Sequence, residues 1–183
     1  MNKTKFIFST VLACLATSSA LAHPEHDSPT SGAASAPKNL VLFIGDGMGQ
    51  VHIDATVFNM SGQPGEPGEL DRLIFERFPS VGMTTTPSAN SFVTDSAAAG
   101  TSIASGYKTN NGMVGIRPDG TELSTIADIA AENDMKVGII SSVGINHATP
   151  AVFYSHAEKR GNYTSIAEQL IAADWLDFAV GGG

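Results

Sequence analysis

The sequence has a single cysteine, Cys14, and a single tryptophan among 183 residues. One cysteine cannot form an intramolecular disulfide, so stability must come from packing, metal ions or oligomerisation. Basic residues are also scarce, with 10 Lys and Arg against 18 Asp and Glu and a net charge of −8. This balance argues against general binding to nucleic acid or to an anionic membrane. It leaves a small anionic substrate open, because a few cations or metal ions can reverse the field inside a cleft.

The N-terminus has the pattern of a secretory signal peptide over residues 1–22. Two lysines within the first five residues precede a short apolar stretch at 6–15, and Ala20-Leu21-Ala22 is a small-x-small cleavage site. The stretch is too short for a transmembrane helix, which needs about 20 apolar residues. A lipid anchor at Cys14 is a weaker alternative because bulky Leu12 precedes it. We therefore expect an exported protein, periplasmic or secreted, with no membrane segment in its mature form.

Residues 23–38 are rich in Pro, Ser, Ala and Gly without periodicity, which indicates a flexible linker. His23 and His26 could bind a stray metal ion, but a solvated tail is the simpler interpretation.

The full sequence has 42% hydrophobic and 15% charged residues, which is ordinary globular composition. After residue 38, strand patterns alternate with helix patterns. This alternation predicts an α/β sandwich around a mostly parallel sheet. The chain ends on three glycines directly after a strand, and we interpret Gly183 as the cut end of a longer sequence. We expect strands at 39–44, 80–86, 136–142 and 178–180, helices at 50–59, 70–78, 95–105, 150–158 and 165–173, and one more helix with Leu123, Ile126, Ala127 and Ala130 on one face.

Asp46 lies in a glycine turn directly after the first expected strand, where α/β folds place their ligands. A carboxylate there suits a hard or borderline cation. A dinucleotide fingerprint is disfavoured, since the third small residue would be Gln50 and a carboxylate would repel a pyrophosphate. Taken alone, Asp46 could be a simple turn or cap residue.

Ser96 lies in the first turn of an Ala-rich helix, where backbone N–H groups and the helix dipole favour a phosphoryl group. Taken alone, Asp95 and Ser96 could be ordinary cap residues. No Gly-x-Ser-x-Gly elbow surrounds Ser96, which disfavours an α/β-hydrolase esterase.

A third group follows the strand expected at 136–142. His147 and Thr149 come after the strand end, and Arg160 could offer a planar fork to a phosphate. Taken alone, an arginine beside Lys159 is more simply a solvated surface residue.

Together, VLFIGDGMG at 41–49, VTDSAA at 93–98 and HATPA at 147–151 closely resemble the alkaline phosphatase family in order and spacing. The resemblance covers residues 39–183, including the terminal glycines, which lie mid-domain in the family. It implies a three-layer α/β sandwich with a central, mostly parallel sheet flanked by helices, of which residues 39–183 would be the truncated N-terminal part of the catalytic domain.

The resemblance also implies a phosphate monoester hydrolase with two zinc ions and one magnesium ion. Ser96 would be the nucleophile that becomes phosphoserine and would also contact metal. Asp46 would bridge one zinc and the magnesium, and Thr149 would ligate magnesium. Arg160 would bind the substrate phosphate together with Ser96, and Asp95 would orient that arginine. Small phosphomonoesters would be the substrates, and the family suggests a homodimer.

Two departures from the family affect the metal sites. His147 occupies a position where some members have Asp and others His, so either magnesium or zinc could occupy the third site. The family's remaining ligands come after the glycines. We do not expect His52 or His156, on presumed helices, to replace them.

Two alternative functions remain open. A related phosphodiesterase or sulfatase of the same superfamily would usually have Thr or a modified Cys or Ser as its nucleophile, which Asp95-Ser96-Ala97 fits poorly. A non-catalytic fragment that binds metal or phosphate is the second alternative.

Overall fold

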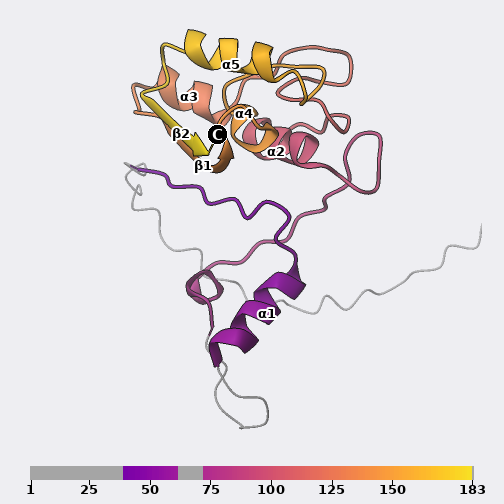
Figure 1. The fold of residues 1–183 in the computed structure, drawn as a ribbon, viewed down its shortest axis with the longest axis vertical. Helices are drawn as coiled ribbons and strands as arrows, with labels where there is room; N and C mark the ends of the chain where they lie inside the picture. The colour runs from indigo at the N-terminus through magenta and orange to yellow at the C-terminus, as the bar shows by residue number, and fades with distance from the viewer. Residues whose placement is uncertain (1–38, 62–71, 183) are drawn as a thin grey trace, which may run out of the picture. The chain divides into compact units, whose positions relative to one another are not determined.

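A computed structural model describes residues 39–61 and 72–182 (Figure 1). The chain divides into two units, residues 1–42 and 43–183, and only residues 39–42 of the first unit are described. The expected signal peptide and linker therefore lie outside the described residues. Among the described residues, no helix is long and apolar enough to cross a membrane.

The sheet of the second unit is a parallel pair, β1 (Gly138–Gly144) and β2 (Phe178–Gly182). Both strands lie close to their predicted positions, and the parallel pair with flanking helices confirms the α/β class. The pairing begins with Gly138 opposite Phe178. Glycine is needed at 138 because the Phe178 ring occupies the space that a Cβ would fill.

Helices connect and flank these strands. The crossover from β1 to β2 contains α4 (Ala148–Ala151) and α5 (Tyr163–Ala172), and α4 contacts both β1 and α2 (Ser96–Ser105). α2 in turn contacts α3 (Ile126–Glu132). Figure 1 shows α2, α3, α4 and α5 grouped around the strand pair.

The core of this unit is built largely from small side chains. Gly100 of α2 lies so close to Val152 that an added Cβ would come within 3.0 Å of that side chain. This close approach favours glycine and brings α2 against the segment that follows α4. The core comprises Ala97, Ala104, Val114, Ala148, Ala151, Val152, Tyr154, Ala157 and Ile166.

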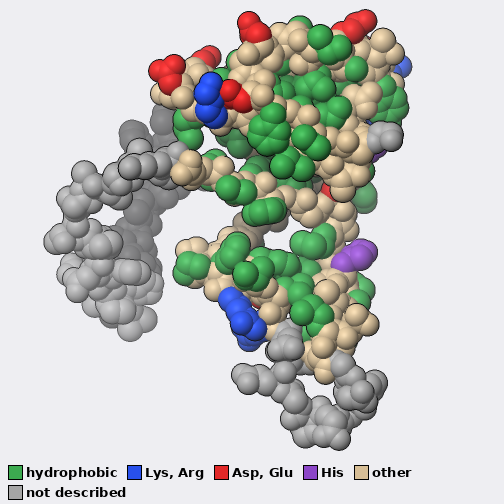
Figure 2. All heavy atoms as spheres, turned by 60° about the vertical axis from the view of Figure 1, so that its left-hand side comes forward, with side chains coloured by type: hydrophobic (Ala, Val, Ile, Leu, Met, Phe, Trp, Pro, Cys, Tyr) green, Lys and Arg blue, Asp and Glu red, His purple; other side chains and the backbone are tan. Residues whose placement is uncertain are grey.

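Two expected strands are wrong. Residues 39–44 and 80–86 are extended or irregular and pair with no strand among the described residues. A strand needs a hydrogen-bonded neighbour as well as an apolar pattern, and these segments have none. Most of their apolar side chains are exposed, as Phe43 and Met83 are at 88% and 100%. Figure 2 shows exposed hydrophobic side chains in green over much of its visible face.

The first helix, α1 (Gln50–Ser61), is confirmed, whereas the helix expected at 70–78 is reduced to the 3-10 turn η1 (Ile74–Arg77). The helix expected at 150–158 is also mostly wrong, because α4 ends at Ala151. Beyond it the chain turns, and Ala157 forms an antiparallel bridge with Val114. A continued helix would use the same backbone groups for its own hydrogen bonds, so the bridge and the longer helix exclude each other.

Candidate active site

Ser96 is the first residue of α2, as the sequence predicts. Asp95 is the N-cap in extended conformation, and its Oδ1 accepts a hydrogen bond from the Ala98 N–H at 3.0 Å. The C-cap is Gly106 in the left-handed conformation, with φ 77°. Ala97 and Ala98 are buried at 0% and 1% exposure, so the first turn of the helix is anchored in the core. Ser96 itself is half-buried, which holds its hydroxyl in place while leaving it reachable.

Arg160 joins the two cap residues. Its Nη1 donates to Asp95 Oδ2 at 3.1 Å and to Ser96 Oγ at 2.9 Å. The side chains of Arg160 and Asp95 are only 30% and 26% exposed, so solvent screens this ion pair less than one on the open surface. Within the described part of the chain, no hydrogen bond occupies Nε or Nη2 of Arg160. Those donors could bind an oxyanion beside Ser96.

Gly112 joins the same group through its backbone. Its N–H donates to Asp95 Oδ2 at 3.1 Å, and its carbonyl accepts from the Arg160 N–H at 2.6 Å. A φ of 86° favours glycine at this position. The sequence analysis gave this position no role, although the Asn111-Gly112 dipeptide is typical of a turn with positive φ.

The environment of Asp95 favours its charged form. Partial burial by itself raises the pKa of the carboxyl group, but hydrogen bonds from the Ala98 and Gly112 N–H groups and from the Arg160 guanidinium outweigh it, so the pKa lies below its ordinary value. Asp95 is therefore an anion at neutral and alkaline pH, which suits a residue that orients an arginine.

Asp46 and Thr149 form a second pair, with the Thr149 hydroxyl donating to Asp46 Oδ2 at 2.7 Å. Asp46 lies in a turn that is closed by a hydrogen bond from the Met48 N–H to the Gly45 carbonyl. The next residue of this turn, Gly47, has a φ of 68°. Thr149 lies in α4, shortly after β1 ends. The sequence placed both residues beyond strand ends, and the structure brings their side chains together.

His147 precedes α4 as its N-cap and stacks on Tyr163, with ring centroids 6.3 Å apart. Its Nδ1 is buried and has no hydrogen-bond partner among the described residues. A buried imidazole nitrogen without a partner is unusual, and it suits a group that binds an external ligand. No hydrogen bond in the described part of the chain links His147 to Asp46 or Thr149.

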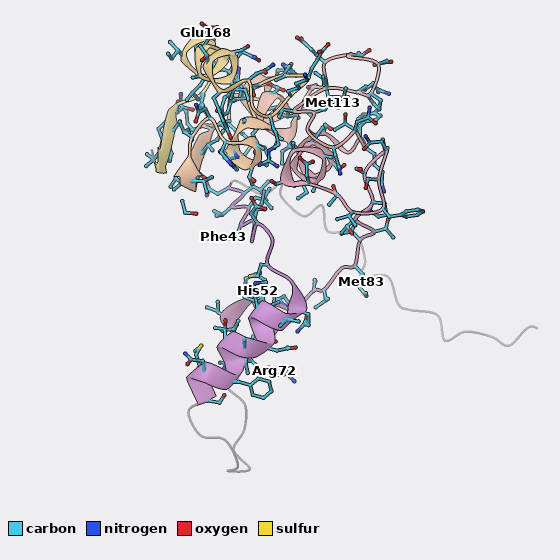
Figure 3. The ribbon with its side chains drawn as sticks, turned by 45° about the vertical axis from the view of Figure 1, so that its right-hand side comes forward. Phe43, His52, Arg72, Met83, Met113 and Glu168 are labelled. Atoms are coloured by element: carbon cyan, nitrogen blue, oxygen red, sulfur yellow. The ribbon has the colours of Figure 1, made fainter. Side chains whose placement is uncertain are left out.

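The described residues do not assemble a complete metal centre, since residues 39–61 and 72–182 contain no cluster of three or more His, Cys, Asp or Glu side chains able to hold a metal ion. The other two described histidines contribute to no such cluster. His52, labelled in Figure 3, lies on α1. The Nε2 of His156 lies 3.0 Å from the Leu123 carbonyl oxygen, which is a structural contact.

These observations define an α/β protein in which a serine at a helix N-terminus shares an arginine with its neighbouring aspartate. A model of the alkaline phosphatase family matches residues 37–182. The chain therefore belongs to the alkaline phosphatase family, as the three motifs indicated.

Individual relatives agree with this result. The chain is 36% identical to Alkaline phosphatase 3 of Bacillus subtilis over 158 residues, which is 80% of this chain and 32% of that protein. It is 34% identical to the human tissue-nonspecific isozyme over 137 residues, 69% of this chain and 26% of the isozyme. The chain thus spans about a third or less of the length of the curated relatives it matches.

Among solved structures, a histidine-to-aspartate mutant of TAB5 alkaline phosphatase with Mg bound in its M3 site matches 80% of this chain. The match has a TM-score of 0.70 at 39% identity and covers 40% of that chain. The cold-active alkaline phosphatase of a psychrophilic Shewanella species matches with a TM-score of 0.69 at 36% identity, covering 76% of this chain and 35% of that one.

Proposed function

We propose that this chain contributes the nucleophile and the phosphate-binding arginine of a phosphate monoester hydrolase that works through a phosphoserine at Ser96. The observation that carries this proposal is the position of Arg160 Nη1, which donates to both Ser96 Oγ and Asp95 Oδ2. A guanidinium held beside a serine hydroxyl at a helix N-terminus is suited to binding a phosphoryl group as that serine attacks it.

Ser96, Arg160 and Asp95 have separate roles in the proposed reaction. The Ser96 oxygen forms a bond to phosphorus as the bond from phosphorus to the ester oxygen breaks. The serine proton passes to solvent hydroxide, and the ester oxygen leaves as the alkoxide, or as the alcohol once it has taken a proton from water. Arg160 holds the non-bridging oxygens and stabilises the charge that develops on them. Asp95 keeps Arg160 oriented, and water then cleaves the phosphoserine to release phosphate and restore Ser96.

The family implies two zinc ions and one magnesium ion, and the donors described here fit them only in part. The Asp46 carboxylate and the Thr149 hydroxyl are adjacent oxygen donors, which suit magnesium, and the unpartnered His147 Nδ1 is a further candidate donor. The TAB5 mutant with Mg bound supports a magnesium site in this family. When bound, such metals lower the pKa of a hydroxyl group and neutralise phosphoryl charge.

Zinc fits the described residues less well. Asp46 and Ser96 are the donors we propose for zinc, but a catalytic zinc needs about three protein ligands. We therefore derive no step through zinc from these residues.

We further propose export after cleavage behind Ala22, a linker over residues 23–38, a catalytic-domain portion over 39–183 and a homodimeric assembly. The signal pattern and the family support these proposals. N-terminal sequencing of the protein from periplasm or medium should begin at His23. A mature protein that keeps Met1, or that begins at a lipid-modified Cys14, would contradict the proposed cleavage.

The test of the proposed reaction is Ser96→Ala in the complete gene product, supplied with zinc and magnesium and assayed with p-nitrophenyl phosphate at alkaline pH. Turnover should fall by at least a thousandfold, on the order of the loss seen when a nucleophile is removed, and no phosphate should be trapped covalently at low pH. Phosphate binding should persist because Arg160 remains.

Ser102→Ala is the matched control. Ser102 lies on the same helix, and its hydroxyl donates to the carbonyls of Ala98 and Tyr107, so its loss should leave turnover nearly unchanged. A Ser96→Ala protein that hydrolyses the substrate at the normal rate, or still traps phosphate, would place the nucleophile elsewhere.

A further inference from the structure

The Asn111 side chain forms hydrogen bonds with the backbone immediately before Ser96. Its Nδ2 donates to the Val93 carbonyl at 2.8 Å, and its Oδ1 accepts from the Asp95 N–H at 3.3 Å. The side-chain amide thus spans Thr94 and contacts the backbone on both sides of it. The two contacts also fix the amide orientation, because a flipped amide would place its NH₂ group against the Asp95 N–H.

Asn111 is itself held in place. Its backbone N–H donates to the Asn90 side-chain oxygen at 2.9 Å, and the next residue, Gly112, contacts both the Asp95 carboxylate and the Arg160 N–H. Met113, labelled in Figure 3, marks this loop. One turn therefore contacts the backbone before Ser96, the carboxylate that orients the arginine, and the backbone of the arginine.

This arrangement contributes more to geometry than to stability. Asn111 is exposed, and hydrogen bonds at exposed sites contribute little net free energy to folding. A displacement of about 1 Å at a reacting group, by contrast, can lower a rate about a hundredfold. The Ser96 hydroxyl follows directly from this hydrogen-bonded segment, so a small shift of Asp95 would move both the nucleophile and its arginine.

We propose that Asn111 is a positioning residue for phosphoryl transfer, which holds Ser96 and Asp95 in register with Arg160. The inference rests on the proposed function of Ser96. It predicts that Asn111→Ala lowers kcat per active site by about ten- to a hundredfold, while KM and the melting temperature change little.

The experiment compares wild type, Asn111→Ala and Asn133→Ala in the complete gene product, with zinc and magnesium present. Asn133 is the matched control, because it is also exposed and its Nδ2 donates to a backbone carbonyl, that of Ile129, at 2.8 Å. Active sites are counted as covalent phosphate trapped at low pH, and kcat with p-nitrophenyl phosphate is divided by that count. Amide hydrogen exchange at Asp95 gives a readout that does not depend on activity.

A fall in kcat per trapped site in Asn111→Ala alone, with faster exchange at Asp95 and a melting temperature near that of wild type, supports the positioning role. If kcat per site stays within about twofold of wild type, the inference is overturned while the proposed function stands, since the wild type still forms phosphoserine. A lower melting temperature with fewer active sites of normal kcat shows a merely structural role and also overturns it. If the wild type traps no phosphate, the proposed function is wrong, and the inference that rests on it is wrong as well.

Discussion

The Thr149 hydroxyl donates to Asp46 Oδ2 at 2.7 Å across 103 positions of sequence. Asp46 lies in a glycine turn, and Thr149 lies in the short helix that follows β1. Both positions were expected beyond the ends of strands. The segment before Asp46 forms no strand here, and this hydrogen bond directly joins a side chain of the first motif to one of the third.

Replacing Thr149 tests whether this pair binds a cation. Thr149→Val keeps the shape of the side chain but removes the hydroxyl oxygen, so the affinity for magnesium should fall by about 10- to 100-fold, as for other changes at metal-site residues. The measurement is a magnesium titration of the complete gene product by calorimetry, supported by the magnesium dependence of turnover. Thr149→Ser should retain most of the affinity.

Thr56→Val serves as the control for this substitution. The Thr56 hydroxyl donates to the His52 carbonyl within α1, so its removal should leave magnesium binding unchanged. If Thr149→Val binds magnesium as tightly as wild type, the hydroxyl is not a ligand and the contact with Asp46 is only structural.

Replacing Arg160 tests its role in binding phosphate. In Arg160→Ala the binding free energy of inorganic phosphate should weaken by about 1–3 kcal/mol, because a charge-assisted contact is lost. The inhibition constant of phosphate should therefore rise by about one to two powers of ten. Arg160→Lys should recover only part of this affinity, since an ammonium group cannot form the planar fork. The inhibition constant of phosphate is the quantity to measure.

The adjacent Lys159 is the control, because it is exposed and has the same charge. Lys159→Ala should leave the inhibition constant unchanged. If Lys159→Ala weakens inhibition and Arg160→Ala does not, the phosphate-binding residue has been misidentified by one position.

The elements that could be predicted from the sequence have their determinants nearby in the chain. α2 begins after Asp95 and ends before Gly106, both residue types with strong cap preferences. Strands at 39–44 and 80–86 were wrong although their composition suits strands, because pairing depends on a neighbour that composition does not reveal. The length of α4 was wrong for a similar reason, since the bridge between Ala157 and Val114 ends it.

The candidate site, too, could be predicted only where its residues lie in recognisable motifs. Ser96, Asp95 and Arg160 were found through motifs, and the structure brings the three together. Asn111 and Gly112 were missed because their contacts with Asp95 join segments 16 and 17 residues apart. An Asn-Gly turn indicates its own backbone conformation but not which distant segment it will contact.

Tyr154 should make stability depend on pH in the alkaline range. Its hydroxyl donates to the Ile145 carbonyl at 2.6 Å, and burial raises its pKa to about 12. In the unfolded chain it loses its proton near pH 10. Between these values the unfolded state binds fewer protons, so the tyrosine's contribution is complete below about pH 10 and is lost as the pH rises toward 12.

Tyr154→Phe should therefore flatten the fall in unfolding free energy over this window and lower stability by about 0.5–1.5 kcal/mol at neutral pH, through loss of one hydrogen bond. Urea unfolding at a series of pH values measures both effects. Tyr107→Phe is the control, because this ring is 48% exposed and lies against Arg117, a contact that phenylalanine keeps. If both variants show the pH dependence of wild type, ionisation of Tyr154 does not control alkaline stability.

Residues 23–183 by themselves should have no phosphatase activity, and the reason is the number of metal ligands. The described donors near the candidate site are Asp46, Thr149, His147 and Ser96, and they form no cluster of three or more acidic or imidazole side chains. A catalytic zinc needs about three protein ligands and an open position, and a two-metal mechanism needs two such sets. Exposed apolar side chains on the strand pair, such as Ile140 at 74%, should also make this polypeptide prone to aggregate.

The test is to purify residues 23–183, add zinc and magnesium, and assay p-nitrophenyl phosphate beside the complete gene product and its Ser96→Ala variant. Turnover within about tenfold of an active complete product, abolished by a chelator, would show that residues 23–183 already hold a full ligand set.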